Sequence, residues 1–305
     1  MIHLLTLTLA ASGYQYILSG SAADVTPATR PGYLLAGGGG SDDASHRWFL
    51  ERAGYGDIVV LRASGSDGYH PYFAELGPVD SVETILFRDV SAADDPFVLD
   101  RIRRAEGIFL AGGDQWNYVR YWRGTAVGRE INAAIARGVP IGGSSAGLAV
   151  LGEFAFTAER DTVTSAQALA DPFDPHVTLL GGFLKIPALR CLITDSHFSQ
   201  RDRLGRLLVF LGRLRDASDA CPAITGIGID EGTSVQVEPD GAMKVSGRGS
   251  AWVLKLRSKP GLKAGVKPSI AAVEAERLPA GSKYVIQVGA GLLSGDPYGN
   301  RLPVR

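Results

Sequence analysis

The chain has 305 residues, of which 45% are hydrophobic, and a formal net charge of −1. This length suffices for one large α/β domain, or for one domain with a small appendage, and the composition allows a full buried core. The balanced charge gives no support to a nucleic-acid partner, and no apolar stretch approaches the roughly 20 residues that a membrane-spanning helix needs.

Residues 1–29 form an N-terminal segment with two interpretations. The short apolar run Leu4–Ala11 leads into small residues, which resembles the end of a secretory signal near its cleavage point. No Lys or Arg precedes the run, and its alternation of leucine and threonine is equally typical of a first β-strand. The sequence slightly favours export, to the periplasm or outside the cell, over a cytoplasmic location.

Short apolar runs alternate with amphipathic runs from about residue 30 to residue 240. The first predicted strand, at 33–36, runs into four glycines at 37–40. Further strands are expected at 57–61, 84–87, 108–111 and 139–142, and helices at 94–105, 125–137 and 146–151. This alternation predicts an α/β domain with a mostly parallel sheet sandwiched by helices. In such sheets, ligands bind beyond the carboxyl ends of the strands.

The pattern changes after Gly241. Residues 251–256 and 284–288 alternate between apolar and polar side chains, and turn residues separate them. Such runs are typical of antiparallel strands. Residues 241–305 are therefore predicted to form a β-rich C-terminal extension.

The only cysteines are Cys191 and Cys221. Two buried thiols are the favoured interpretation, because a free cysteine is usually a small core residue. A disulfide would require an oxidising compartment and backbones that come close together. Neither cysteine lies in a C-x-x-C motif or a zinc-like cluster, so no metal and no other cofactor is expected.

The segment Gly143–Gly147 fits the pattern G-x-S-x-G between a predicted strand and a predicted helix. A nucleophile elbow needs small residues there because its serine sits in a tight turn. The start of the following helix offers backbone N–H groups to a developing oxyanion. Taken alone, the pattern fits a phosphate-binding or structural turn equally well. Ser145 is the candidate nucleophile.

His197 is the candidate base, because it follows an apolar run at 191–194 and so lies at a strand end. The acid that orients it could come before or after His197 in the chain. The α/β-hydrolase order places the acid before the histidine, where Asp161, Asp171, Asp174 and Asp195 are available. The other candidates are Asp230 and Glu231, which follow the apolar strand at 227–229 and could orient the imidazole from there.

Arg201, Arg203 and Arg206 follow the candidate base. Most helical arginines lie on a solvated face. The functional alternative is a carboxylate-binding pocket, because a guanidinium group binds a carboxylate through two parallel hydrogen bonds. The short distance in sequence to His197 favours the pocket.

These residues together resemble the cyanophycinases, in the wider dipeptidase E-like group of serine peptidases. The resemblance spans roughly residues 33–240. Any one of its four segments is weak evidence for the family, whereas all four in the family's order are highly specific for it. The four segments are Ala111–Gln115, Gly142–Gly147, Asp195–Phe198 with the three arginines, and Gly226–Glu231.

The resemblance implies a glutaminase-like three-layer fold, a homodimer and a Ser-His-Glu triad. The triad positions are Ser145, His197 and Glu231, and the oxyanion would be bound by the N–H groups of Ala146 and a glycine near Gly113. The implied substrate pocket consists of Gln115, Asp195, Arg201, Arg203 and Arg206, with Asp195 receiving the substrate's own guanidinium or amine.

The resemblance also implies a substrate. Cyanophycinases hydrolyse cyanophycin, a poly-aspartate chain that bears arginine on each side-chain carboxylate, and release β-Asp-Arg dipeptides through an acyl-enzyme. Three alternatives stay open: an aspartyl or isoaspartyl dipeptidase of the same family, an esterase-type α/β-hydrolase with its acid before His197, and a binding protein that keeps the arginine pocket. The presence of all three triad candidates argues against the binding protein.

Overall fold

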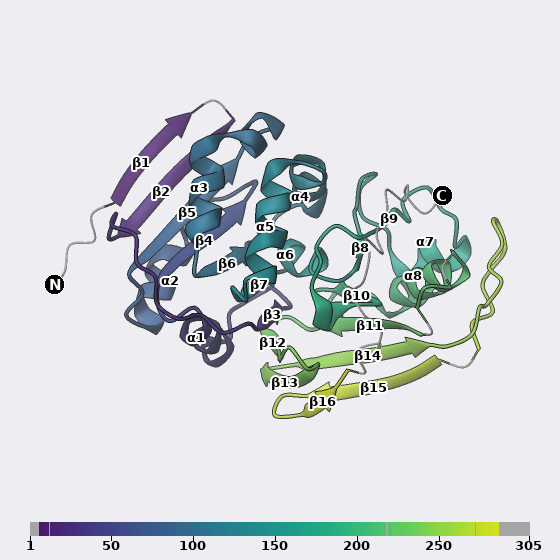
Figure 1. Cartoon of the computed structure of the whole chain (residues 1–305). Helices are drawn as coiled ribbons and strands as arrows, with labels where there is room; N and C mark the ends of the chain where they lie inside the picture. The colour runs from purple at the N-terminus through teal and green to yellow at the C-terminus, as the bar shows by residue number, and fades with distance from the viewer. Residues whose placement is uncertain (1–5, 12, 218, 222, 272, 287–305) are drawn as a thin grey trace.

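The computed structural model describes residues 6–11, 13–217, 219–221, 223–271 and 273–286. Its strands form two sheets that lie beside each other in an elongated molecule (Figure 1). The predicted α/β fold with parallel strands flanked by helices is confirmed. The parallel strands are divided between the two sheets, and antiparallel strands complete both.

The first sheet has ten strands in the order β1-β2-β5-β4-β6-β7-β3-β12-β13-β16. The five strands from β5 to β3 are parallel to one another, whereas the strands on both flanks are antiparallel. The bounds are β1 (Thr6–Ala11), β2 (Tyr14–Gly20), β3 (Tyr33–Ala36), β4 (Asp57–Arg62), β5 (Ser81–Phe87), β6 (Gly107–Leu110), β7 (Ile141–Ser144), β12 (Thr233–Val237), β13 (Ala242–Gly247) and β16 (Lys283–Val285).

The second sheet has six strands in the order β15-β14-β11-β10-β8-β9. Its central strands β8, β10 and β11 are parallel, and β9, β14 and β15 pair antiparallel at the flanks. The bounds are β8 (Phe154–Phe156), β9 (Leu179–Gly181), β10 (Leu192–Asp195), β11 (Ile224–Ile229), β14 (Ser250–Leu256) and β15 (Val273–Pro279).

The strands of the C-terminal segment belong to both sheets. β13 and β16 extend the first sheet, and β14 and β15 extend the second. The strand expected at 251–256 corresponds to β14, and the strand expected at 284–288 begins as β16, with its residues 287 and 288 outside the described part of the chain. The N-terminal run forms the edge strand β1 from Thr6 onward.

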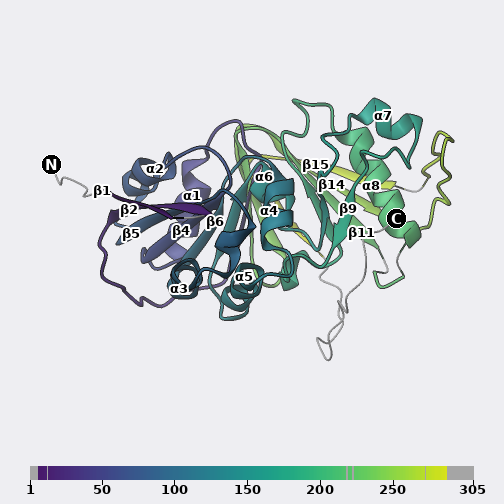
Figure 2. The same cartoon turned by 90° about the horizontal axis from the view of Figure 1, so that it is seen from above.

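Helices cover both faces of the first sheet, with α1 and α2 on one face and α3 and α5 on the other (Figure 2). Within the described residues, no helix is both long and apolar enough to cross a bilayer. The bounds are α1 (Asp43–Arg52), α2 (Tyr69–Leu76), α3 (Pro96–Arg104), α4 (Gln115–Trp122), α5 (Ala126–Ala136), α6 (Ala146–Ala149), α7 (Ser165–Ala170) and α8 (Leu204–Ala217), with short 3-10 helices η1 (Val90–Asp94) and η2 (Pro187–Leu189).

Local sequence explains where the predicted helices begin. The side chain of Asp95 accepts hydrogen bonds from the backbone N–H groups of Phe97 and Val98, and Pro96 occupies the first turn of α3. The Thr125 hydroxyl likewise accepts a hydrogen bond from Gly128 N–H at the start of α5. α6 is shorter than expected: it ends at Ala149, whereas the predicted helix extends to residue 151.

Cys191 and Cys221 form a disulfide, so the expectation of two free thiols is wrong. Cys191 immediately precedes β10, and Cys221 lies shortly before β11. Because β10 and β11 pair in parallel, with Leu192 opposite Thr225, their preceding segments are brought together. The two Cα atoms lie 5.7 Å apart, a separation that a disulfide spans.

Replacing both cysteines by alanine should lower the free energy of unfolding by about 2–4 kcal/mol, because the bond restricts the unfolded chain. Urea unfolding of the wild type and of the double variant, each with and without reductant, measures this effect. Reductant should bring the wild type to the stability of the variant and leave the variant unchanged. The prediction would be contradicted if the wild type had the same free energy of unfolding with and without reductant.

Candidate active site

The turn between β7 and α6 presents Ser145 in a strained conformation, with φ 53° and ψ −111°. The glycines on either side are required by close packing. A Cβ atom on Gly147 would clash with the carbonyl of Leu110, and one on Gly143 would lie 2.5 Å from the carbonyl carbon of Gly147. The backbone N–H of Ser145 donates to the carbonyl of Ala36 on β3 at 3.0 Å, which fixes the turn against the neighbouring strand.

Ser145, His197 and Glu231 lie in one hydrogen-bonded line. Ser145 Oγ is 2.7 Å from His197 Nε2, and His197 Nδ1 is 2.6 Å from Glu231 Oε1. His197 follows β10 and Glu231 follows β11, so both side chains project from the carboxyl ends of neighbouring parallel strands. In space, the hydroxyl is followed by the imidazole and then by the carboxylate, which is the arrangement of nucleophile, base and acid in serine acyl transfer.

The acids that precede His197 have other partners. Asp195 is hydrogen-bonded to Arg203 and Arg206, and Asp174 is hydrogen-bonded to the His176 ring. The geometry therefore favours the order Ser, His, Glu over the α/β-hydrolase order.

Burial lowers the pKa of His197, and the charges of Arg201 and Arg203 lower it further, whereas Glu231 opposes both effects. A lowered pKa keeps the imidazole neutral at neutral pH. A neutral Nε2 can accept the proton of the Ser145 hydroxyl, which is the role of a general base.

The glycine loop after β3, residues 37–39, packs directly on this line of side chains. The carbonyl of Gly37 accepts a hydrogen bond from the backbone N–H of His197 at 3.0 Å. Gly38 has φ +83°, and a Cβ atom there would lie 2.8 Å from His197 Nε2 and 2.9 Å from Ser145 Cβ. A Cβ on Gly39 would lie 2.5 Å from Glu231 Cδ. These glycines are not among the site residues predicted from the sequence, where their signal is a glycine run at the carboxyl end of a predicted strand.

The two backbone segments predicted to bind an oxyanion both lie next to Ser145. Ala146 is the first residue of α6. The turn at residues 112–113 follows β6, and a Cβ atom on Gly112 would lie 3.5 Å from Ser145 Cβ. The buried hydroxyl of Tyr118 donates to the carbonyls of Ala111 at 2.7 Å and Gly112 at 3.3 Å, which fixes that turn. Tyr118 is likewise not among the site residues predicted from the sequence.

A cavity of about 600 Å³ adjoins this turn, and we call it the first cavity. It brings together most of the residues predicted for the substrate pocket, with a loop from β8 forming the opposite wall. The predicted residues that line it are Gly113, Gln115, Arg201, Arg203 and Arg206.

The three arginines have different surroundings. Arg206 is only 2% exposed, and its guanidinium binds both carboxylate oxygens of Asp195 at 2.8 and 2.6 Å. Arg203 donates to Asp195 at 3.1 Å and to the carbonyl of Ser196 at 2.8 Å. Arg201 is exposed, and among the described residues its side chain has no acidic partner. Arg201 is thus free to bind an anionic group.

Among the described residues, one group of three side chains has a spacing that suits a metal ion: Glu153, Cys191 and Cys221. Its two sulfur atoms are bonded to each other.

Comparison with known proteins shows the family to which this chain belongs. The model of peptidase family S51 matches residues 72–245. The cyanophycinase of Synechococcus elongatus is 32% identical over 239 residues, which are 74% of this chain and 69% of that protein. The cyanophycinase of Trichormus variabilis is 30% identical over 241 residues, 74% of each chain. The crystal structure of a peptidase from an acI-B1 Actinobacterium shares the fold, with a TM-score of 0.56 and 16% identity over 85% of this chain and 98% of its own.

The protein is therefore a serine-type peptidase. It belongs to peptidase family S51, as the resemblance of its four segments predicted.

Replacing Gly38 by alanine should reduce the rate at which a fluorophosphonate probe labels Ser145 by about 100-fold, because a Cβ atom would displace the imidazole from the hydroxyl. Gly281→Ala is the matched control. Gly281 has a similar φ of +91°, and a Cβ atom there meets nothing within 4 Å. Equal labelling rates in the two variants would contradict the prediction.

Arg206→Ala should lower the free energy of unfolding by about 3–5 kcal/mol, because it removes the two shorter hydrogen bonds to the buried Asp195 carboxylate and leaves it only the longer one from Arg203. Arg201→Ala should change it by less than about 0.5 kcal/mol, as is usual for an exposed side chain. Urea unfolding of both variants tests this difference, and equal stabilities would show that the buried pair has no special role.

Proposed function

We propose that the protein hydrolyses cyanophycin to β-Asp-Arg dipeptides, with Ser145 as nucleophile, His197 as general base and Glu231 as the acid that orients it. The observation that carries this proposal is the hydrogen-bonded line from Ser145 Oγ through His197 to Glu231, at 2.7 and 2.6 Å, beside an arginine-lined cavity.

The chemistry follows from the positions of these atoms. His197 Nε2 takes the proton of Ser145 Oγ as the oxygen attacks the scissile carbonyl carbon. The N–H groups of Ala146 and Gly113 bind the oxyanion of the tetrahedral intermediate. His197 then donates the proton to the leaving amine, and an acyl-enzyme remains. His197 then deprotonates a water that attacks the ester carbonyl, and it returns this proton to Ser145 Oγ as the ester bond breaks. Glu231 stabilises the imidazolium in both steps.

The arginines of the first cavity support a substrate that carries carboxylates. Three acidic residues, Asp114, Glu159 and Asp161, share the lining and balance this charge, which suits a substrate that also carries guanidinium groups. Arg201 extends into it without an acidic partner among the described residues, and Arg203 lines it while bound to Asp195. Guanidinium groups bind carboxylates by paired hydrogen bonds. Each unit of cyanophycin carries the free α-carboxylate of its arginine, which such a cavity can bind. The curated relatives described above are named cyanophycinases.

Asp195 and Arg206 have a different role in this proposal. Both carboxylate oxygens of Asp195 already accept hydrogen bonds from arginines of the protein. Arg206 also donates to the hydroxyl of Thr162 at 3.1 Å and to the carbonyl of Val163 at 3.2 Å, in the loop on the other side of the cavity. We assign the pair to holding this wall in place, and Arg201 and Arg203 to the substrate. Gln115, whose amide donates to the carbonyl of Phe156 at 3.3 Å, lies at the same wall.

The test is incubation of the purified protein with insoluble cyanophycin, followed by mass spectrometry of the soluble products. We expect β-Asp-Arg from the wild type and none from Ser145→Ala. Glu231→Ala should lose most of the activity, whereas an esterase that uses an acid before His197 would keep it. Absence of β-Asp-Arg with the wild type would overturn the polymer as substrate and direct the search to short aspartyl or isoaspartyl peptides.

A further inference from the structure

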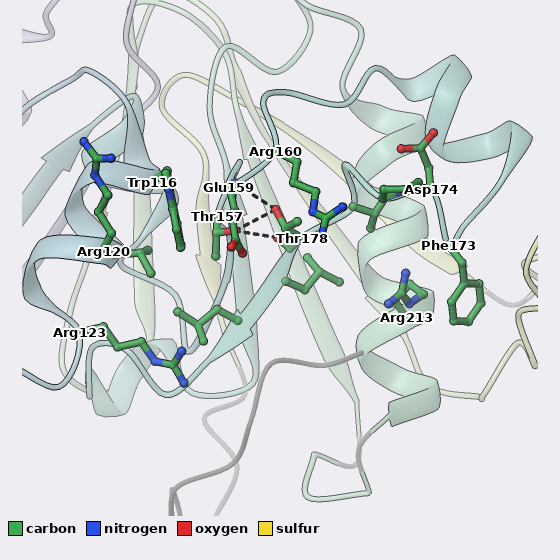
Figure 3. Close-up of a pocket in the computed structure, with 15 residues that line it drawn as sticks. Trp116, Arg120, Arg123, Thr157, Glu159, Arg160, Phe173, Asp174, Thr178 and Arg213 are labelled. Carbon is green, nitrogen blue, oxygen red and sulfur yellow. Dashed lines mark hydrogen bonds between the residues drawn. The ribbon is translucent and has the colours of Figure 1, made fainter.

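A second cavity of about 630 Å³ lies next to the first, and we call it the second cavity. The two cavities share Trp116 and Glu159 in their walls. Figure 3 shows Arg120 and Arg123 on one side of the second cavity, Phe173 and Arg213 on the other, and Glu159 between them. Its size lies within the range of ordinary ligand pockets.

Two of the arginines in its wall are free. The side chains of Arg123 and Arg160 are exposed, and in the described part of the chain neither has a hydrogen-bond or acidic partner. The others have partners: Arg120 donates to the hydroxyl of Tyr121 at 2.6 Å, and Arg213 is buried and donates to the carbonyl of Pro172 at 2.8 Å. Arg123 and Arg160 can therefore bind an anionic ligand at no loss of internal contacts.

The wall also carries an acidic and an aromatic side chain. The Glu159 carboxylate is exposed, and among the described residues it forms no ion pair. Trp116 is half-buried at the boundary between the two cavities. A carboxylate binds guanidinium by paired hydrogen bonds, and an indole ring attracts it through the face of its π system. The second cavity thus offers groups for both charges of one zwitterionic ligand.

The backbone of this wall is fixed. The Thr157 hydroxyl donates to the hydroxyl of Thr178 at 2.8 Å, across the strands β8 and β9. Both hydroxyl oxygens accept from the backbone N–H of Glu159 at 3.3 Å (Figure 3). The backbone of Glu159 is therefore held just beyond the end of β8, in the wall that the two cavities share, and Arg160 follows it into the wall of the second cavity.

We propose that the second cavity binds a further Asp-Arg unit of a cyanophycin chain, beyond the two units that flank the scissile bond. This inference rests on the proposed function. Each unit carries a free carboxylate and a guanidinium group. Arg123 and Arg160 bind the carboxylate, and Glu159 and Trp116 bind the guanidinium. The enzyme consequently prefers oligomers that reach the second cavity to substrates of only two units.

The test compares synthetic oligomers of two and of eight β-Asp-Arg units. For the Arg123→Ala/Arg160→Ala double variant, the ratio of kcat/KM on the long oligomer to that on the short one should fall about tenfold, through a higher KM for the long oligomer, because charge-assisted hydrogen bonds are lost. The rate on the short oligomer should stay as in the wild type. Arg129→Ala, which removes an exposed arginine of α5 that lines neither cavity, is the matched control.

The outcomes separate the two proposals. If the wild type cleaves neither oligomer, the proposed function fails. If it cleaves both and the double variant keeps the wild-type ratio, only the second binding site is overturned. Calorimetric titration of Ser145→Ala with the eight-unit oligomer gives an independent measure. Binding should weaken about tenfold when the two arginine substitutions are added, and unchanged binding would exclude the site.

Discussion

The hydrogen bond between Ser145 and His197 joins two different sheets. Ser145 follows β7 of the first sheet, whereas His197 and Glu231 follow β10 and β11 of the second. The 2.7 Å contact therefore depends on how the sheets pack against each other. One continuous core that includes Leu35, Leu110 and Leu148 from the first side, with Ile227 and Ile229 from the second, holds them together.

The glycine loop at 37–39 lies in close contact with residues of both sheets at this junction. It leaves the first sheet after β3, and its carbonyl groups accept hydrogen bonds from the backbone N–H groups of His197 and of Gly232, the residue after Glu231. Side chains in this loop would occupy the space of the imidazole and the carboxylate. The loop therefore couples the packing of the sheets to the alignment of the three side chains, which explains why small residues are needed there as well as around Ser145.

The arginines that follow β10 differ in their surroundings. Asp195 and Arg206 form a buried ion pair that is fully hydrogen-bonded. Such a pair fixes geometry more than it stabilises the fold. Arg201, in the turn that precedes α8, lies in solvent with its charge available. In the proposed function, Arg206 orients the wall of the first cavity and Arg201 contacts the substrate directly.

The sequence by itself determined the fold class and the identity of the candidate residues. The alternation of strands and helices, and the turn chemistry around Ser145, are local properties that a linear pattern records. Composition and spacing could not decide whether the Asp candidates or Glu231 would meet His197, nor that Cys191 would pair with Cys221, because these contacts join residues about 30 positions apart through the pairing of β10 with β11. The tertiary structure also decided that Arg201 and Arg206 have different environments. Arg206 is buried because distant segments, those of Asp195 and of Thr162–Val163, pack against it, whereas Arg201 is left exposed before the start of α8.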